Sequence, residues 1–193
     1  SDVYKRQLIM PLSMCMGSWA QAVIFPQKKQ PGVAKITQKS NSYQLANKVL
    51  KASFINTGGK LYFNGCSELG LQPDTELFKV LLGDGSTVAA SKMKLEDVKI
   101  VTLGEDPSAA TASLRYAGKA LEARFTYGDL SITWRAVLRD GSHYLRTEMD
   151  IKATRDQSMK GIVAMNYQVA KNSAYTAPEV VGNTRGAILA SNH

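Results

Sequence analysis

The chain is poor in the residues that build disulfide frameworks and metal sites. It contains 2 cysteines and 2 histidines among its 193 residues, and we expect Cys15 to be removed with a leader segment. The remaining Cys66 then has no partner for an internal disulfide and no second ligand at metal spacing, so we expect a small buried side chain there. No phosphate-binding loop, dinucleotide fingerprint or sustained helical period occurs. The sequence therefore predicts no metal site and no cofactor.

We expect residues 1–22 to lie outside the folded domain. Ser1–Gln7 resembles translated sequencing-adapter sequence rather than protein. The short apolar run Leu8–Trp19, followed by Ala20-Gln21-Ala22, is typical of a signal peptide with an A-x-A cleavage site and is too short to span a bilayer. A buried N-terminal segment is the alternative. The sequence thus predicts a secreted or periplasmic protein with no membrane span and one domain over 23–193, and the apolar end Ile188–His193 suggests a truncated coding fragment.

The charge balance is basic, with 24 Lys and Arg against 16 Asp and Glu and a formal net charge of +8. Without residues 1–22 the balance is 22 basic against 15 acidic residues, or +7. The lysines are spread along the chain without the aromatic interleaving of a nucleic-acid stripe. We therefore expect a solvated basic surface and no nucleic-acid partner.

Short segments of alternating polarity separated by Gly, Asp and Asn predict an all-β antiparallel β-sandwich. After a polar lead-in over Val23–Ser42, with one helical turn expected within Thr37–Val49, the pattern changes to strands. The expected strands are Lys48–Ile55, Lys60–Phe63, Glu76–Leu82, Thr87–Ala90 and Leu95–Leu103, followed after a loop over Glu105–Ala110 by four strands within Ser113–Lys152.

The last four strands allow the pairing to be counted. We take Gly118-Lys119, Gly128-Asp129 and Asp140-Gly141 as two-residue hairpin loops, since such turns favour Gly and Asp-Gly. This register gives three apolar rows on one face: Ala112, Phe125, Ile132 and Met149; Leu114, Ala123, Trp134 and Thr147; and Tyr116, Leu121, Ala136 and Leu145. Trp134 is thereby predicted to lie in the core.

The opposite face of this predicted sheet carries a charged row of Arg115, Glu122, Arg135 and Arg146. Opposite charges across neighbouring strands are favourable, whereas Arg135 beside Arg146 is unfavourable unless an acidic group such as Glu148 covers the pair. Either the face is solvated, or it contacts an anionic or polyhydroxyl ligand or a partner domain's carboxylate. The candidate carbohydrate-binding residues are Arg135, Arg146 and Tyr144.

No pair of residues predicts a catalytic centre. Glycoside hydrolysis needs two carboxylates flanking the scissile bond, one with a raised pKa, but Glu148 and Asp150 both point outward from their strand. We expect Ser142 to be a turn residue, and His143 and His193 have no metal-ligand partners. The aromatic residues with sugar-stacking potential, apart from the buried Trp134, are Tyr43, Tyr62, Tyr144, Tyr167 and Tyr175.

The segment Trp134–Arg146 (WRAVLRDGSHYLR) resembles the N-terminal β-sandwich of secreted bacterial glycoside hydrolases of the α-galactosidase/raffinose-synthase type, including Bacteroidetes relatives labelled "enterotoxin". Phe54–Gly65, Leu77–Ser86 and Glu179–Gly182 carry further similarity. The resemblance implies a supersandwich similar to galactose-mutarotase-like domains, followed in full-length relatives by a (β/α)8 barrel. The catalytic carboxylates of such families lie on the barrel, so none is carried over to this chain.

These observations predict a non-catalytic N-terminal β-sandwich of an exported carbohydrate-processing enzyme, a glycoside hydrolase. Its expected partners are a carbohydrate and a C-terminal catalytic barrel. The alternative is a free-standing carbohydrate-binding or surface-adhesion module. A small complete enzyme, such as a sugar epimerase, would need an inward-facing pair of His and carboxylate that the pattern does not contain.

Overall fold

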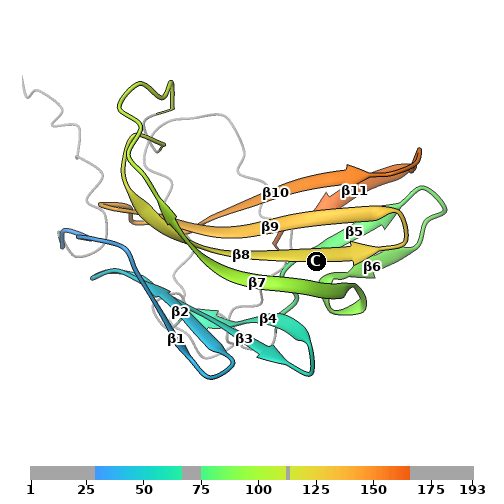
Figure 1. Ribbon diagram of the computed structural model, residues 1–193, viewed down its shortest axis with the longest axis horizontal. Helices are drawn as coiled ribbons and strands as arrows, with labels where there is room; N and C mark the ends of the chain where they lie inside the picture. The colour runs from blue at the N-terminus through green and yellow to red at the C-terminus, as the bar shows by residue number, and fades with distance from the viewer. Residues whose placement is uncertain (1–28, 67–74, 112–113, 166–193) are drawn as a thin grey trace, which may run out of the picture.

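The computed structural model describes residues 29–66, 75–111 and 114–165, and more than half of these residues lie in strands (Figure 1). The 3₁₀ turn η3 (Ala90–Lys92) lies between β6 and β7. The strands are β1 (Lys35–Lys39), β2 (Ser42–Ala46), β3 (Lys51–Thr57), β4 (Lys60–Cys66), β5 (Lys79–Leu82), β6 (Thr87–Ala89), β7 (Lys94–Leu103), β8 (Gly118–Tyr127), β9 (Leu130–Arg139), β10 (Arg146–Ala153) and β11 (Met159–Val163).

All strand pairs are antiparallel, and they form three sheets. One sheet has the order β1-β2-β3-β4, the second β10-β9-β8-β7 and the third β11-β5-β6. The long, curved second sheet lies over the first, and the small third sheet lies beside β7–β10 at one end of the molecule (Figure 1). The predicted all-β antiparallel sandwich is confirmed.

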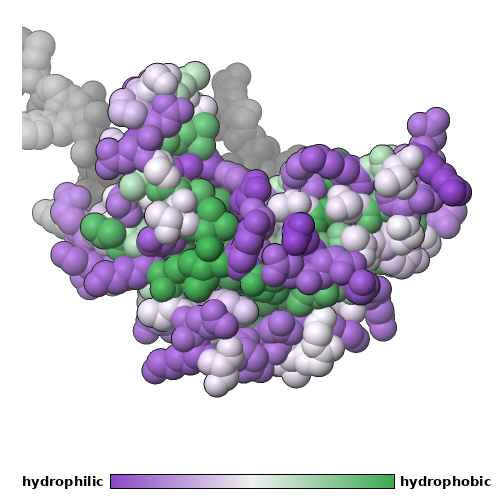
Figure 2. All heavy atoms as spheres, in the orientation of Figure 1, coloured by the Kyte–Doolittle hydropathy of each residue, from purple (hydrophilic) through white to green (hydrophobic). Residues whose placement is uncertain are grey.

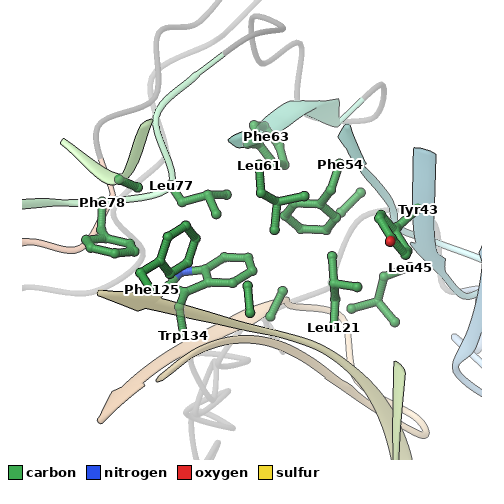
Figure 3. Close-up of a cluster of buried hydrophobic side chains, with 14 of the residues drawn as sticks. Tyr43, Leu45, Phe54, Leu61, Phe63, Leu77, Phe78, Leu121, Phe125 and Trp134 are labelled. Carbon is green, nitrogen blue, oxygen red and sulfur yellow. The ribbon is translucent and has the colours of Figure 1, made fainter. Parts of the chain in front are cut away.

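The core lies between the two four-stranded sheets and is built around aromatic side chains (Figure 3). Phe54 of β3 makes edge-to-face contacts with Phe63 and with Trp134, with ring centroids 5.6 Å apart in each pair. Phe78 and Phe125 form a third such pair at 5.3 Å. Each aromatic pair contributes about 0.5–1.5 kcal/mol beyond the burial of its area. The contact of Phe54 with Trp134 joins the two sheets directly.

The hairpin of β8 and β9 has the predicted register, with Phe125 opposite Ile132 and Ala123 opposite Trp134. The alternation of apolar and polar residues in LSITWRAVLR places one apolar row on the inner face of β9. Trp134 is fully buried, as predicted, and Cys66 is also buried. Local alternation and a two-residue turn are sufficient to specify this part of the fold.

The predicted hairpin at Gly118-Lys119 is wrong, because both residues lie within β8. The described residues 114–117 form no strand, and the fourth strand of the sheet is β7 instead. A Cβ atom on Gly118 would lie 2.5 Å from the carbonyl oxygen of Leu138. This glycine therefore permits a close approach of two strands and does not mark a turn.

The two-residue loop predicted at Asp140-Gly141 is also wrong, since six residues separate β9 from β10. The Asp140 carboxylate accepts a hydrogen bond from the Ala34 amide at 2.7 Å, and the Gly141 amide donates to the Gly32 carbonyl at 2.9 Å. The longer loop shifts the pairing of β10 by two residues, so that Trp134 lies opposite Met149. A shift of two preserves the predicted faces, because side chains alternate with period two.

The helical turn predicted within Thr37–Val49 is not found; the segment contains the hairpin of β1 and β2. The predicted strands over Lys48–Ile55 and Glu76–Leu82 begin three residues later than expected. Figure 2 shows apolar surface exposed between the two large sheets. Ile100 of β7 is 40% exposed. No helix among the described residues is long and apolar enough to cross a membrane.

Candidate functional site

The outer face of β7–β10, which we call the charged face, carries a row of alternating charges. In the register, Lys99 lies opposite Glu122, Glu122 opposite Arg135 and Arg135 opposite Glu148. Glu122 accepts from Lys99 Nζ at 2.9 Å through one carboxylate oxygen and from Arg135 Nε at 2.5 Å through the other. The row therefore compensates its own charges.

Glu122 is the centre of this row and is only 5% exposed. Burial is the largest influence on its pKa and raises it, but the hydrogen bonds from Lys99 and Arg135 together outweigh burial. The pKa of Glu122 is therefore lowered below its ordinary value of 4.5. A carboxyl group that acts as a general acid needs the opposite shift, so Glu122 holds the face together and is not suited to donate a proton.

The predicted charged row was correct for Glu122 and Arg135 and wrong at both ends. Arg115 lies outside the sheet, and its Nε donates to the carbonyl of Ala109. Arg146 lies opposite Val137 rather than Arg135, and its Nη2 lies 2.5 Å from Glu148 Oε1. The unfavourable Arg135–Arg146 pair does not form, because the longer loop before β10 brings Glu148 into that place.

Of the three candidate carbohydrate-binding residues, only Tyr144 has a mostly solvent-exposed side chain. It is 56% exposed in the loop between β9 and β10. The side chains of Arg135 and Arg146 are 36% and 28% exposed and engaged in ion pairs. Ser142 Oγ donates to the Tyr144 carbonyl, as expected for a turn serine. His193, Tyr167 and Tyr175 lie outside the described residues.

A shallow hollow of about 200 Å³ lies on the outer face of the other large sheet, β1–β4. Its wall consists of outward side chains, which are hydroxyls, amides and one amine. They are Thr37, Lys39, Ser42, Gln44, Ser53 and Asn64. The inward-facing Tyr43 and Phe54 also line it, and strand alternation leaves only their backbone on this face. The hollow holds hydrogen-bonding groups and no carboxylate.

The strand register explains how these side chains come together. Thr37 lies opposite Gln44, and Gln44 lies opposite Ser53. The pairing of β3 with β4 then shifts between Ala52 and Phe54. Asn64 and Gly65 therefore share the place opposite Ser53. Gly65 has a φ of +99°, which only glycine adopts readily, so a β-bulge presents Asn64 to the hollow.

An aromatic side chain lies beside the polar wall. Tyr62 points to the same side of β4 as Asn64, two positions away, and it is half-buried. In the register it lies opposite Ile55, which lies opposite Ser42. Hydroxyl and amide groups bind sugar hydroxyls, while an aromatic or aliphatic surface packs against the apolar face of a sugar ring. The arrangement can bind a polyhydroxylated ligand without reacting with it.

Sequence reasoning named Tyr62 but missed Gln44, Ser53 and Asn64. The only signal was the polar composition of Thr37–Gln44, which is also typical of ordinary solvated strands and their turn. Among the described residues, no group of three His, Cys, Asp or Glu side chains is placed to hold a metal ion.

The described residues form an antiparallel β-sandwich with a polar, carboxylate-free hollow on the outer face of β1–β4. Comparison of the chain with protein-family models, curated proteins and solved structures finds no match.

Proposed function

We propose that this chain is a non-catalytic, carbohydrate-binding β-sandwich, and that the hollow on β1–β4 is its sugar site. The observation that supports this function is the wall of hydroxyl and amide groups around Gln44 and Asn64, with the Lys39 amine beside them and Tyr62 next to it. A shallow site on a rigid sheet suits a sugar, since the strands hold the polar groups in place before the ligand arrives.

The charged face supports a non-catalytic role. Its most buried carboxylate, Glu122, is ion-paired on both oxygens and has a lowered pKa. Retaining and inverting glycosidases instead need one carboxyl group with a raised pKa and a second carboxylate across the scissile bond. A parent glycoside hydrolase that carries its catalytic residues on a C-terminal barrel, with this chain as its exported galactose-mutarotase-like sandwich, agrees with this role.

Glycan-array screening of the full chain, followed by calorimetry with the best oligosaccharide, tests the proposal. The variant Gln44→Ala/Asn64→Ala removes two amides from the hollow, and each lost hydrogen bond costs about 1 kcal/mol. We expect the Kd to rise at least tenfold. Thr133→Ala, on the outer face of β9, is the matched control and should change the Kd less than twofold.

Binding of no glycan, or equal binding by the double variant and the wild type, would overturn the proposed site. The adjoining coding sequence distinguishes an accessory domain of a glycosidase from a free-standing carbohydrate-binding module. A following barrel with carboxylates at its strand ends supports the accessory domain of a glycosidase. A stop codon there supports the free-standing module.

A further inference from the structure

The outer face of β1–β4 is positively charged, and we call it the lysine face. The outward positions of its strands hold four lysines and neither Asp nor Glu: Lys35, Lys39, Lys51 and Lys60. No described carboxylate lies within ion-pair distance of Lys35, Lys39 or Lys60. Figure 2 shows mainly hydrophilic surface along this side of the molecule.

The lysines surround the hollow that binds sugar in the proposed function. Lys39 forms part of its wall, and Lys60 lies two positions before Tyr62 on the same side of β4. Lys35 lies two positions before Thr37 on β1. Neighbouring outward positions along a strand are about 7 Å apart. An oligosaccharide seated in the hollow would therefore extend toward an amine at either end.

The positive charge of the lysine face favours anionic saccharides over neutral ones. A neutral sugar can bind through the hydroxyls, amides and aromatic side chain, and it gains no net charge attraction from the amines around the hollow. Carboxylate groups on the sugar would be attracted to these amines and would find no competing carboxylate on the strands. The face has no arginine, which is the residue suited to bidentate phosphate recognition, so a nucleic-acid backbone fits it less well.

We propose that the lysine face binds an anionic saccharide, with a uronate-bearing glycan as its ligand class. The inference rests on the proposed function, since it places the sugar in the same hollow, with Gln44 and Asn64 contacting hydroxyls. Lys39 and Lys60 attract the carboxylates.

Two ligands that differ only in charge provide the test: a uronic-acid oligosaccharide and its carboxyl-reduced counterpart. We expect the full chain to bind the uronate form at least tenfold more tightly at low salt, and the difference to shrink as salt is added. Lys39→Gln/Lys60→Gln should weaken uronate binding about tenfold and change binding of the reduced form less than twofold. Lys94→Gln/Lys152→Gln, on the second sheet, is the control and should leave both affinities unchanged.

Equal affinity for the two oligosaccharides would overturn the anionic preference and leave the proposed carbohydrate function in place. If the chain binds neither oligosaccharide but binds single-stranded DNA or anionic lipid vesicles through these lysines, the proposed saccharide ligand is wrong. In that case the lysine face attracts anions in general. If Gln44→Ala/Asn64→Ala also binds neutral glycans as tightly as the wild type does, the proposed carbohydrate function is wrong as well.

Discussion

The outer faces of the two large sheets differ in how their charged side chains are arranged. The charged face pairs each cation of its central row with a carboxylate, from Lys99 to Glu148. The lysine face carries four lysines on strands that offer no carboxylate. Opposite charges on adjacent strands stabilise the pairing of those strands. Like charges on adjacent strands destabilise a sheet slightly and attract ions of the opposite sign. We therefore expect the charged face to contribute stability, and the lysine face is the one proposed to bind a ligand.

Close packing of the strands should matter most on the charged face. Arg139 extends across Gly118, and its Nη1 donates to the carbonyls of Tyr116 and Gly104 at 2.6 and 3.1 Å. An added Cβ at Gly118 would meet backbone atoms, so Gly118→Ala should lower the free energy of unfolding by about 3 kcal/mol. Urea denaturation measures the loss. Gly104→Ala adds a Cβ where nothing lies within 4 Å and should change stability by less than about 0.5 kcal/mol.

Neutralising Glu122 should have the next largest effect. Glu122→Gln leaves no carboxylate between Lys99 and Arg135, and we expect the free energy of unfolding to fall by about 2 kcal/mol. Ser53→Ala, at the centre of the lysine face, should change stability by less than about 0.5 kcal/mol. If both variants lost equal stability, the division between the faces would be wrong.

Acid should weaken the charged face selectively. The pKa of Glu122 is lower in the folded protein than its ordinary value of 4.5. Its stabilisation is therefore complete above the unfolded pKa and is lost as the pH falls through the folded pKa. The difference in urea midpoint between wild type and Glu122→Gln should shrink as the pH is lowered below about 4.5. A constant difference down to pH 2 would contradict this explanation.

The smallest effect is expected from the lysine face itself. Lys35→Glu places an acidic residue among the lysines and should raise the free energy of unfolding by less than about 0.5 kcal/mol, since exposed charges interact weakly in water. Added salt should remove the gain by screening. The same variant should weaken binding of the uronate oligosaccharide, so a change in affinity with little change in stability would sharpen the comparison.

The sequence predicted the parts of the sandwich that depend on neighbouring residues. The β8–β9 hairpin and the burial of Trp134 follow from alternation around Gly128-Asp129. The loops predicted at Gly118 and Asp140 are wrong because the roles of these residues depend on distant parts of the chain. Gly118 permits a close approach to β9, and the Asp140 carboxylate binds the Ala34 amide. Each looks locally like a turn residue.

The proposed binding face is harder to predict from sequence for a physical reason. A polar row such as Thr37, Gln44 and Ser53 has the same composition whether it binds a ligand or only water. What distinguishes it is the bulge at Gly65 and the gathering of lysines from separate strands, and both depend on the register of β1–β4. The basic charge was visible in the sequence, but its concentration on one face was not.

The hydrogen bond from Ala34 to Asp140 has a consequence for the order of folding. It joins residues 106 positions apart, whereas β1–β4 pair only with their neighbours in sequence. The first sheet can therefore form during synthesis before Asp140 leaves the ribosome, with Phe54 and Phe63 uncovered until Trp134 arrives. Closing such a long loop is entropically costly. We expect pulse-labelled hydrogen exchange during refolding to protect the amides of β2 and β3 early and that of Ala34 last; simultaneous protection would contradict this order.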